Sequence, residues 1–395
     1  MIDKIKEIIS SHEIEFLKVR GKLHEYPEVS GEEYETSKFL KEFVKNEGLE
    51  IVEIGGTGFI VVLDSGKEGK TVALRTDIDA LPMQESKYNL IGRKKYISKN
   101  NGVCHSCGHD AHMAMLLWSM RVLNQVKESL SGRILFLFEE GEERGLGIKS
   151  MLDGLNRFKV DAIWGIHMAT FLETGKVSIS PGPVMAGVTP FKIQVIGKSG
   201  HSSRPDLAIN PLFGAAQIIT ALGSSWANRM DPNKPVTLGL SQISGGTATN
   251  IIPEKVDVIG SLRYFDTIAG KYAIELIEKT SNAAAASQLC EVNFEKGYAT
   301  KPVTNDRNLA LMAHDCCSKI LSQEYIASGE TWYASESFNR YDEICPSILI
   351  FLGTKSISGG YGAEAHKDRF DIDESGLING VKSTVMFAMS YLQEG

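Results

Sequence analysis

The chain contains 395 residues, 43% of them hydrophobic and 23% charged, and it carries a formal net charge of −7. Its length predicts two domains rather than one core, and an acidic balance without a basic stripe argues against nucleic acid as a partner. No apolar run is long enough to span a membrane or to form the centre of a signal peptide, and the six cysteines lack the spacing of a disulfide framework, so we expect a cytoplasmic protein that does not bind membranes.

The N-terminal region predicts helices followed by short strands. Residues 3–23 and 32–47 place apolar side chains at helical spacing, so each stretch is expected to form an amphipathic helix. Residues 50–64 contain two short apolar runs around the sequence GGTG. Since neither a lysine followed by serine or threonine nor a helix comes after the glycines, a hairpin turn is favoured over a phosphate-binding loop.

Three later apolar runs predict buried strands, and each is followed directly by side chains that could do chemistry. They are residues 71–76 before Asp77 and Asp79, residues 133–138 before the acidic run 139–143, and residues 162–166 before His167. Open α/β sheets place their sites at the carboxyl ends of their strands, so we expect these side chains to meet at one edge. Two alternatives stay open: Asp77 and Asp79 could only shape a turn, and the acidic run could be a solvated surface.

The densest cluster of potential ligands lies in residues 101–112, NGVCHSCGHDAH, next to a helix predicted for 111–122. It contains Cys104, His105, Cys107, His109, Asp110 and His112. Thiolate and imidazole bind borderline-soft divalent metals, and a carboxylate adds neutralising charge. The alternatives are a redox pair of Cys104 and Cys107, or ordinary polar loop residues. Neither explains why Cys107 and His109 sit two apart with further His and Glu at strand ends downstream, so a metal site is favoured.

From residue 187 the pattern changes to a compact α+β segment of about a hundred residues. Its predicted strands are 188–196, 236–243 and 254–263, and its predicted helices are 208–222 and 271–288. Two flexible loops lie within it, one with His201 and one at 245–250, although a lone loop histidine is usually a surface residue. The α/β pattern resumes with a helix at 306–321, a strand at 347–352 whose following loop closes on His366, and a helix at 373–392. We therefore expect one domain from residues 1–186 and 301–395, with residues 187–300 inserted as a second.

Taken in order, these segments resemble the aminoacylase/carboxypeptidase superfamily of dinuclear metallohydrolases, in particular the amidohydrolase branch that includes hippurate hydrolase and the indoleacetyl–amino acid hydrolases. The resemblance runs nearly end to end, through HEYPEVSGEE, RTDIDALP, CHSCGHDAHMAMLL, FLFEEGEERGLGIKSM, GIH, GKSGHSSRPDLAINP, GGTATNIIPEKV, ASESFNRY and AHKDRFDIDE. It implies an α/β fold: a catalytic α/β sandwich around a central, mostly parallel sheet, with an inserted α+β domain of ferredoxin-like type that serves as lid and dimerisation domain.

The resemblance also implies roles for individual residues. The implied ligands of two metal ions are Cys107, which both ions would share, and His109, Glu143, His167 and His366. Glu142 matches the family's general base, and Asp79 matches the acid that orients a ligand imidazole. His201 and Asn250 match lid residues that reach the substrate, in dimeric relatives from the neighbouring subunit, and Arg263 is implied to hold a substrate carboxylate.

Two segments depart from the family pattern. Where the family usually has FQPAEE this chain has FEEGEE, so Glu139 and Glu140 replace Gln and Pro. Where the family usually has SEDF this chain has SESF, so Ser337 replaces an Asp. Neither departure falls on an implied ligand, and both bear on the substrate range and on the electrostatics around the ligands.

The expected activity is metal-dependent hydrolysis of the amide bond of N-acyl amino acids, with an acetyl, aryl-acyl or auxin-like acyl group, releasing a carboxylic acid and a free amino acid. Glu142 would activate the attacking water. A thiolate ligand favours Zn(II), Mn(II), Co(II) or Ni(II) over Mg(II) and Ca(II), and analogy with the family places Mn(II) or Zn(II) first. The alternatives are a dipeptidase or carboxypeptidase on the same scaffold, or a non-catalytic metal-binding or thiol-redox protein. We also expect a homodimer formed through the inserted domain, where an edge strand offers a pairing surface.

Overall fold

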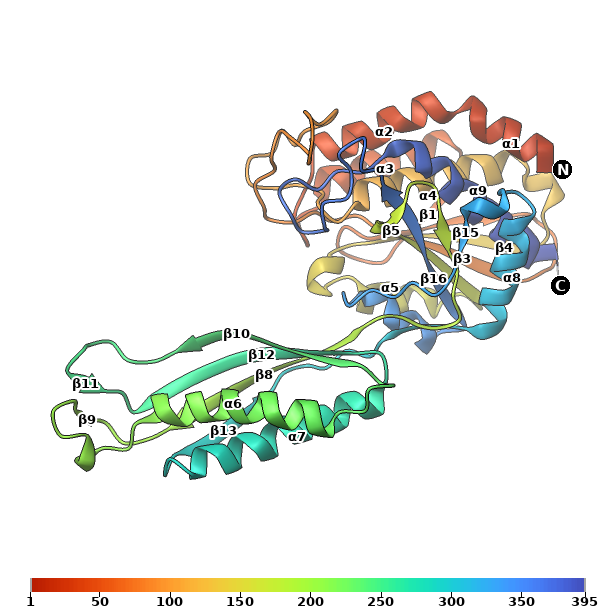
Figure 1. Cartoon of the computed structure of the whole chain (residues 1–395). Coiled ribbons are helices and arrows are strands. Elements are labelled where there is room, and N and C mark those ends of the chain that lie inside the picture. The colour runs from red at the N-terminus through yellow and green to blue at the C-terminus, as the bar shows by residue number, and fades with distance from the viewer. Residues whose placement is uncertain (1, 394–395) are drawn as a thin grey trace. The chain divides into compact units, whose positions relative to one another are not determined.

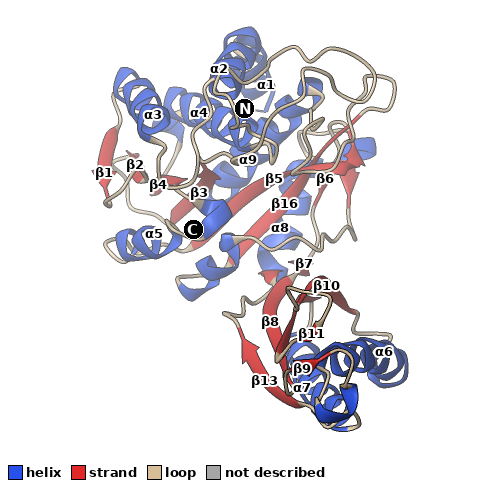
Figure 2. Ribbon diagram, turned by 90° about the vertical axis from the view of Figure 1, so that its left-hand side faces the viewer, coloured by secondary structure: helices blue, strands red, loops and turns tan. Residues whose placement is uncertain are grey.

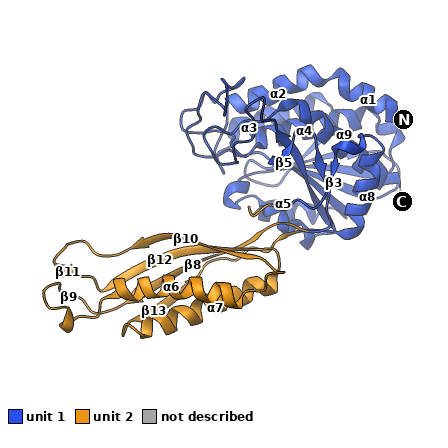
Figure 3. Cartoon of the chain, viewed as in Figure 1, with its two compact units in different colours: residues 1–182, 304–330, 336–395 blue, residues 183–303, 331–335 orange. Residues whose placement is uncertain are grey.

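The computed structural model describes residues 2–393, which form two compact units (Figure 3). The first unit contains the described residues up to Gly182, together with Thr304–Glu330 and the described residues from Glu336 onward. The second contains Pro183–Val303 and the short segment Thr331–Ser335. The limits 187 and 300 that the sequence suggests for the insertion lie within a few residues of 183 and 303, whereas no sequence pattern marks Thr331–Ser335 as part of it.

The first unit is built on an eight-stranded sheet with the strand order β1-β2-β4-β3-β5-β16-β6-β15 (Figure 1). The strands are β1 (Glu50–Glu53), β2 (Phe59–Asp64), β3 (Thr71–Asp77), β4 (Arg133–Glu139), β5 (Ala162–Glu173), β6 (Val177–Ser178), β15 (Ile326–Ala327) and β16 (Ser347–Lys355). The neighbours β4, β3, β5 and β16 run parallel, as do β6 and β15, whereas β1 with β2, β2 with β4 and β16 with β6 are antiparallel. This is the α/β fold with a mostly parallel central sheet that the sequence predicts.

Helices cover both faces of this sheet (Figures 1 and 2). They are α1 (Ile2–Ser11), α2 (Glu13–Glu25), α3 (Tyr34–Asn46), α4 (His109–Gln125), α5 (Ile148–Leu155), α8 (Arg307–Ser318) and α9 (Leu377–Gln393). On one face α4 and α9 form a common core with Val72 and Leu74 of β3, and α1 and α2 pack outside them, while α5 packs against β4 on the other face. Because both faces are covered, β3 is buried along its whole length. None of the helices within residues 2–393 is long and apolar enough to cross a membrane.

The single N-terminal helix predicted for residues 3–23 is in fact two helices. α1 ends at Ser11 and α2 begins at Glu13. The hydroxyl of Ser11 donates a hydrogen bond to the backbone carbonyl of Ile8 at 2.8 Å, and Ser and His are weak helix formers. The local competition for backbone hydrogen bonds therefore ends the first helix although the apolar spacing continues.

The GGTG sequence forms a hairpin turn, as predicted. β1 and β2 pair antiparallel on either side of it, and Gly55 and Gly56 both have positive φ. The carboxylate of Glu140 accepts hydrogen bonds from the backbone N–H groups of Thr57 and Gly58. One acid of the run after β4 is thus used to hold this turn.

The second unit has the element order β8-α6-β10-β12-α7-β13 of a ferredoxin-like fold (Figure 1). Its elements are β8 (Gly187–Ile196), α6 (Pro211–Arg229), β10 (Val236–Ser244), β12 (Lys255–Tyr264), α7 (Thr267–Ala286) and β13 (Glu291–Lys296). The strands form an antiparallel sheet in the order β10-β12-β8-β13, and both helices pack against it. Asn210 caps α6 and Asp266 caps α7 through their side-chain oxygens, so local sequence sets both starts. The sequence analysis missed β13, whose mostly polar side chains give little strand signal.

Candidate metal centre

The carboxyl ends of β3 and β4 and the middle of β5 bring the predicted side chains to one edge of the sheet. β3 and β4 pair in register so that Asp77 lies opposite Glu139. β5 pairs with β3 as far as Gly165, two residues before His167. Asp77, Asp79, Glu139 and His167 are all buried. The acidic run after β4 therefore does not simply form a solvated surface, because its first member lies inside the protein.

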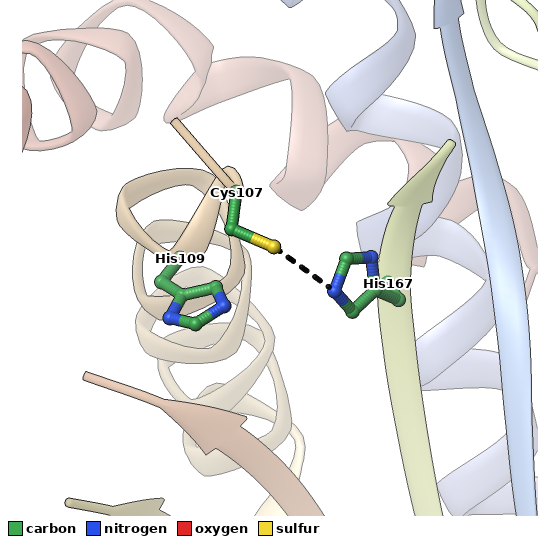
Figure 4. A group of neighbouring side chains, drawn as sticks. All are labelled: Cys107, His109 and His167. Carbon is green, nitrogen blue, oxygen red and sulfur yellow. Dashed lines mark hydrogen bonds between the residues drawn. The ribbon is translucent and has the colours of Figure 1, made fainter. Parts of the chain in front are cut away.

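A glycine in a left-handed conformation shapes the loop that carries Cys107 and His109. Gly108 has a φ of +88° and immediately precedes α4. A Cβ at this position would lie 2.7 Å from Cγ of Met168, so both the backbone conformation and the available space require glycine. Cys107 thus sits on the loop and His109 opens the helix, and Sγ of Cys107 lies 3.6 Å from Nε2 of His167 (Figure 4).

Asp79 holds two of the expected ligands in place. Its Oδ1 lies 3.2 Å from Nδ1 of His109, which is also 2.9 Å from the backbone carbonyl of Asp79. Its Oδ2 accepts hydrogen bonds from the backbone N–H of Glu143 at 3.1 Å and from the hydroxyl of Ser30 at 2.6 Å. With Nδ1 of His109 engaged as a donor, Nε2 is the nitrogen left to bind a cation.

Glu143 and His366 are far apart in the sequence but lie close together in the fold. Oε1 of Glu143 lies 3.2 Å from Nε2 of His366 and 3.8 Å from Nε2 of His109. His366 has a φ of +61°, a conformation that non-glycine residues adopt rarely and that persists where the surroundings enforce it. Its backbone N–H donates to the carbonyl of Ser106 at 2.9 Å, which ties the loop after β16 to the loop before α4.

The donor atoms form overlapping groups that fit bound cations. Four sets have all their ligand atoms within 4.8 Å of one another: Cys107 with His109 and His167, Cys107 with Glu143 and His366, His109 with Glu142 and Glu143, and Asp77 with His109 and His112. Nε2 of His109 and Oε1 of Glu143 are buried, and neither makes a hydrogen bond to any part of the described chain. Buried polar atoms normally have a partner, so two such atoms facing one cluster of donors indicate the place of a cation.

The pKa values of Cys107, His167 and Cys104 are consistent with metal binding rather than redox chemistry. Burial and the charge of Glu143 raise the pKa of Cys107 well above its usual range, so a thiolate forms there only beside added positive charge. Burial lowers the pKa of His167 to about 3, which keeps the ring in the neutral, metal-binding form. Burial raises the pKa of Cys104 to about 11, and a buried thiol of this kind is a poor redox partner.

Glu142 lies beside the donor cluster, and its carboxyl group contacts the segment that contains Glu336 and Ser337. The backbone N–H of Ser337 donates to its Oε1 at 2.8 Å. Burial, together with the negative charge of Glu336, raises the pKa of Glu142 well above its ordinary value. A carboxyl group whose pKa is raised in this way takes up a proton more readily than an ordinary one and can give it away again.

Several residues around the centre received no role from the sequence. Arg75 is buried, with Nη1 2.8 Å from Asp77 and Nη2 2.9 Å from Glu336. Asp77 in turn binds Nδ1 of His112 at 2.8 Å, and Nε2 of His112 accepts from a backbone N–H, so neither nitrogen of that ring is left for a metal. Ser30 and Glu336 lie in HEYPEVSGEE and ASESFNRY, two of the segments that carry the family resemblance. That resemblance was the sequence signal that could have pointed to these two residues.

Three residues named from the sequence belong to the second unit: His201, Asn250 and Arg263. His201 is exposed, and its Nδ1 accepts a hydrogen bond from the backbone N–H of Ser203 at 3.1 Å, so the ring proton lies on Nε2. Arg263 donates to Oγ of Ser335 at 3.2 Å and forms no ion pair with a carboxylate within residues 2–393.

The fold and the donor set together define a metallohydrolase of the α/β class with an inserted α+β domain. The family model described as Peptidase family M20/M25/M40 matches residues 73–390, and the chain belongs to this family, whose members act on amides and peptides. It is 33% identical to Thermostable carboxypeptidase 1 of Saccharolobus solfataricus, over 99% of each chain, and 33% identical to N-acetyl-L-cysteine deacetylase of Bacillus subtilis, over 94% of this chain and 86% of the relative. A crystal structure described as a dinuclear metal binding peptidase from the M20 family, from Bacillus subtilis, superposes with a TM-score of 0.83 at 28% identity and covers 97% of this chain and 99% of its own.

Proposed function

We propose that this protein hydrolyses the amide bond of N-acyl amino acids with two divalent cations per subunit, Mn(II) or Zn(II). The observation that carries the proposal is a carboxylate with a raised pKa, Glu142, directly beside a cluster of thiol, imidazole and carboxylate donors at one edge of the sheet. The likeness to a relative named N-acetyl-L-cysteine deacetylase supports this substrate class.

The donor cluster would hold the cations through Cys107, shared between them, and through His109, Glu143, His167 and His366. When bound, a pair of divalent cations supplies Lewis acidity, which polarises the scissile carbonyl and acidifies water. Glu142 takes a proton from the attacking water as the water oxygen bonds to the carbonyl carbon. The same proton passes to the leaving nitrogen as the C–N bond breaks, giving a carboxylic acid and a free amino acid. The amide of Ser337 holds Oε1 of Glu142 in place for this transfer.

Residues of the second unit would recognise the substrate. His201 has its proton on Nε2, the tautomer that can donate to an oxyanion. Arg263 has no carboxylate partner among the described residues, so its charge is free to bind the carboxylate of an amino acid product. The backbone carbonyl of Asn250 accepts a hydrogen bond from the backbone N–H of Ser202, the residue after His201.

Exchanging Glu142 for glutamine tests the proposal most directly. Glu142→Gln keeps the shape of the side chain and its contact with Ser337 but removes the proton acceptor, so hydrolysis should fall by a factor of about 10²–10⁴ while the metal content stays that of the parent. The protein is loaded with Mn(II) or Zn(II), its metal content is measured by elemental analysis, and turnover is measured with N-acetyl and N-benzoyl amino acids. Parental turnover in this variant would exclude Glu142 as the base.

A peptidase on the same scaffold is the second candidate, because the chain is equally similar to a relative named Thermostable carboxypeptidase 1. The substrate panel should therefore include dipeptides and longer peptides. A specificity constant at least about tenfold higher for peptides than for acylated amino acids would favour the peptidase and count against our proposal.

We also propose that the second unit forms a homodimer. β10 lies at the edge of its sheet and pairs with β12 alone among the described strands, and α6 exposes Leu212, Phe213 and Ile219. An edge strand and exposed apolar side chains both favour association with a second copy. Light scattering that finds only monomer at the assay concentration would contradict this.

A further inference from the structure

Arg75 is surrounded by three carboxylates beneath the edge of the sheet that carries Glu142. Its Nε donates to Glu139 and its Nη1 to Asp77, both at 2.8 Å, and its Nη2 donates to Glu336 at 2.9 Å. All four side chains are almost completely buried. The planar guanidinium directs its charge-assisted hydrogen bonds to three separate acids along fixed directions, so the cluster has a defined geometry.

The cluster reaches Glu142 through Ser337. The hydroxyl of Ser337 donates to Oε1 of Glu139 at 2.6 Å and lies 3.1 Å from Nη2 of Arg75. Ser337 is the first residue of the 3-10 helix η5 (Ser337–Glu343), and its backbone N–H donates to Oε1 of Glu142. The hydroxyl of Tyr341, in the same short helix, donates to the other oxygen of Glu139 at 2.8 Å. Glu139 therefore anchors the segment whose amide holds Glu142.

Glu139 and Ser337 come from distant parts of the chain. The two positions are 198 residues apart in the sequence yet make direct contact beside the same guanidinium. The fold, and not the local sequence, therefore creates this link.

We propose that Glu139 is a positioning residue for Glu142, acting through Ser337. The proposal rests on the proposed function in one respect, because it takes Glu142 as the general base. Glu139 itself does not touch substrate or cation in this account; it fixes the amide that orients the base.

Removing the charge of Glu139 should impair the chemical step more than substrate binding. Glu139→Gln is expected to lower kcat about 10–100-fold while KM changes less than about threefold and metal content stays parental. Ser337→Ala removes the hydroxyl that contacts Glu139 but keeps the backbone amide, and it should also lower kcat. This variant tests the proposal if Glu139→Gln does not fold. Glu140→Gln is the matched control, because that neighbouring acid holds the turn at Thr57 and Gly58 and should leave kcat parental. A kcat within about twofold of the parent in both test variants overturns the proposal.

A rescue experiment separates the positioning role of Glu139 from a general loss of stability. In the double variant Glu139→Gln/Ser337→Asp an acid is supplied from the other side of the contact, within reach of Nη2 of Arg75. Its kcat is expected to recover to within about fivefold of the parent. A double variant no more active than Glu139→Gln would contradict the positioning role.

A crystal structure of Glu139→Gln gives a readout that does not depend on turnover. The distance from the backbone nitrogen of Ser337 to Oε1 of Glu142, 2.8 Å in the parent, should lengthen beyond about 3.5 Å. If the parent splits no acylated amino acid, the proposed function fails, yet this distance still decides the positioning role. An unchanged contact overturns that role whatever the activity.

Discussion

Replacing Glu85 by glutamine is expected to destabilise the protein by about 3 kcal/mol at neutral pH. Glu85 is buried in a polar network beneath the metal loop. Its Oε1 lies 2.9 Å from Nε2 of His24 and 2.8 Å from Nζ of Lys94, and its Oε2 accepts from the backbone N–H of Ser98 at 2.6 Å. His24 continues the network to Asp110, which follows the expected ligand at position 109, so a loss here acts on the packing of α2 against α4.

The magnitude follows from the pKa of the carboxyl group. Burial alone would raise the pKa of Glu85, but the hydrogen bond and charge of His24, with the contacts of Lys94 and Ser98, outweigh it and lower the pKa to about 2. The interval from the ordinary value of 4.5 to about 2 corresponds to about 3 kcal/mol at 1.36 kcal/mol per pH unit. Because the folded pKa is depressed, this stabilisation is fully present above about pH 5 and is lost as the pH falls towards 2.

Urea unfolding followed by circular dichroism, with a chelator present so that bound metal does not contribute, measures the difference between parent and Glu85→Gln. The difference should be constant from pH 8 to pH 5.5 and should narrow by about 1 kcal/mol near pH 3.5–4. Glu68→Gln, an exposed acid in the loop before β3, is the control and should change stability by less than about 0.5 kcal/mol. A Glu85→Gln protein as stable as the parent at pH 7, or a difference unaffected by acid, would refute the reasoning.

Four further outcomes are expected. Asp79→Asn should weaken metal affinity about 10–100-fold, measured by competition with a chromophoric chelator, and parental affinity would contradict its role in orienting His109. Dialysis against a chelator should abolish hydrolysis, and adding Mn(II) or Zn(II) should restore it; turnover that survives removal of all metal would exclude the proposed chemistry. Mixing the inactive variants His201→Ala and Glu142→Gln should restore activity if His201 serves the site of its partner, whereas a mixture as inactive as its components places both residues in one chain's site. Phe213→Glu should shift the light-scattering mass from dimer to monomer, and an unchanged dimer would remove α6 from the interface.

The edge of the sheet could be predicted because its signals are local. The apolar runs at 71–76, 133–138 and 162–166 are continuous, as strands buried on both faces must be, and each is followed at once by polar side chains. In the structure β3 and β4 are each one residue longer than predicted and end at Asp77 and Glu139. β5 is much longer than predicted and continues to Glu173. The extension of β5 carries the chain past His167, where the apolar signal fades although the backbone pairing with β16 persists.

The surroundings of the site could not be predicted in the same way, because they depend on distant contacts. Nothing near Arg75 indicates that it pairs with Glu336, 261 residues away, or that Ser337 contacts Glu142 through its backbone. β6 and β15 are two residues long each, too short to show a period. The positive φ of His366 is likewise set by its partners and not by its residue type.

The chain enters the second unit twice, because the five residues Thr331–Ser335 belong to it as well as the long insertion. The backbone N–H of Trp332 donates to the carbonyl of Val184, and the ring of Tyr333 lies against that of Phe265 with their centroids 4.9 Å apart. Excising residues 183–303 alone would therefore remove the hydrogen-bond acceptor of the Trp332 backbone and the aromatic neighbour of Tyr333. Removing this unit cleanly would therefore require two separate cuts in the chain, one for each segment.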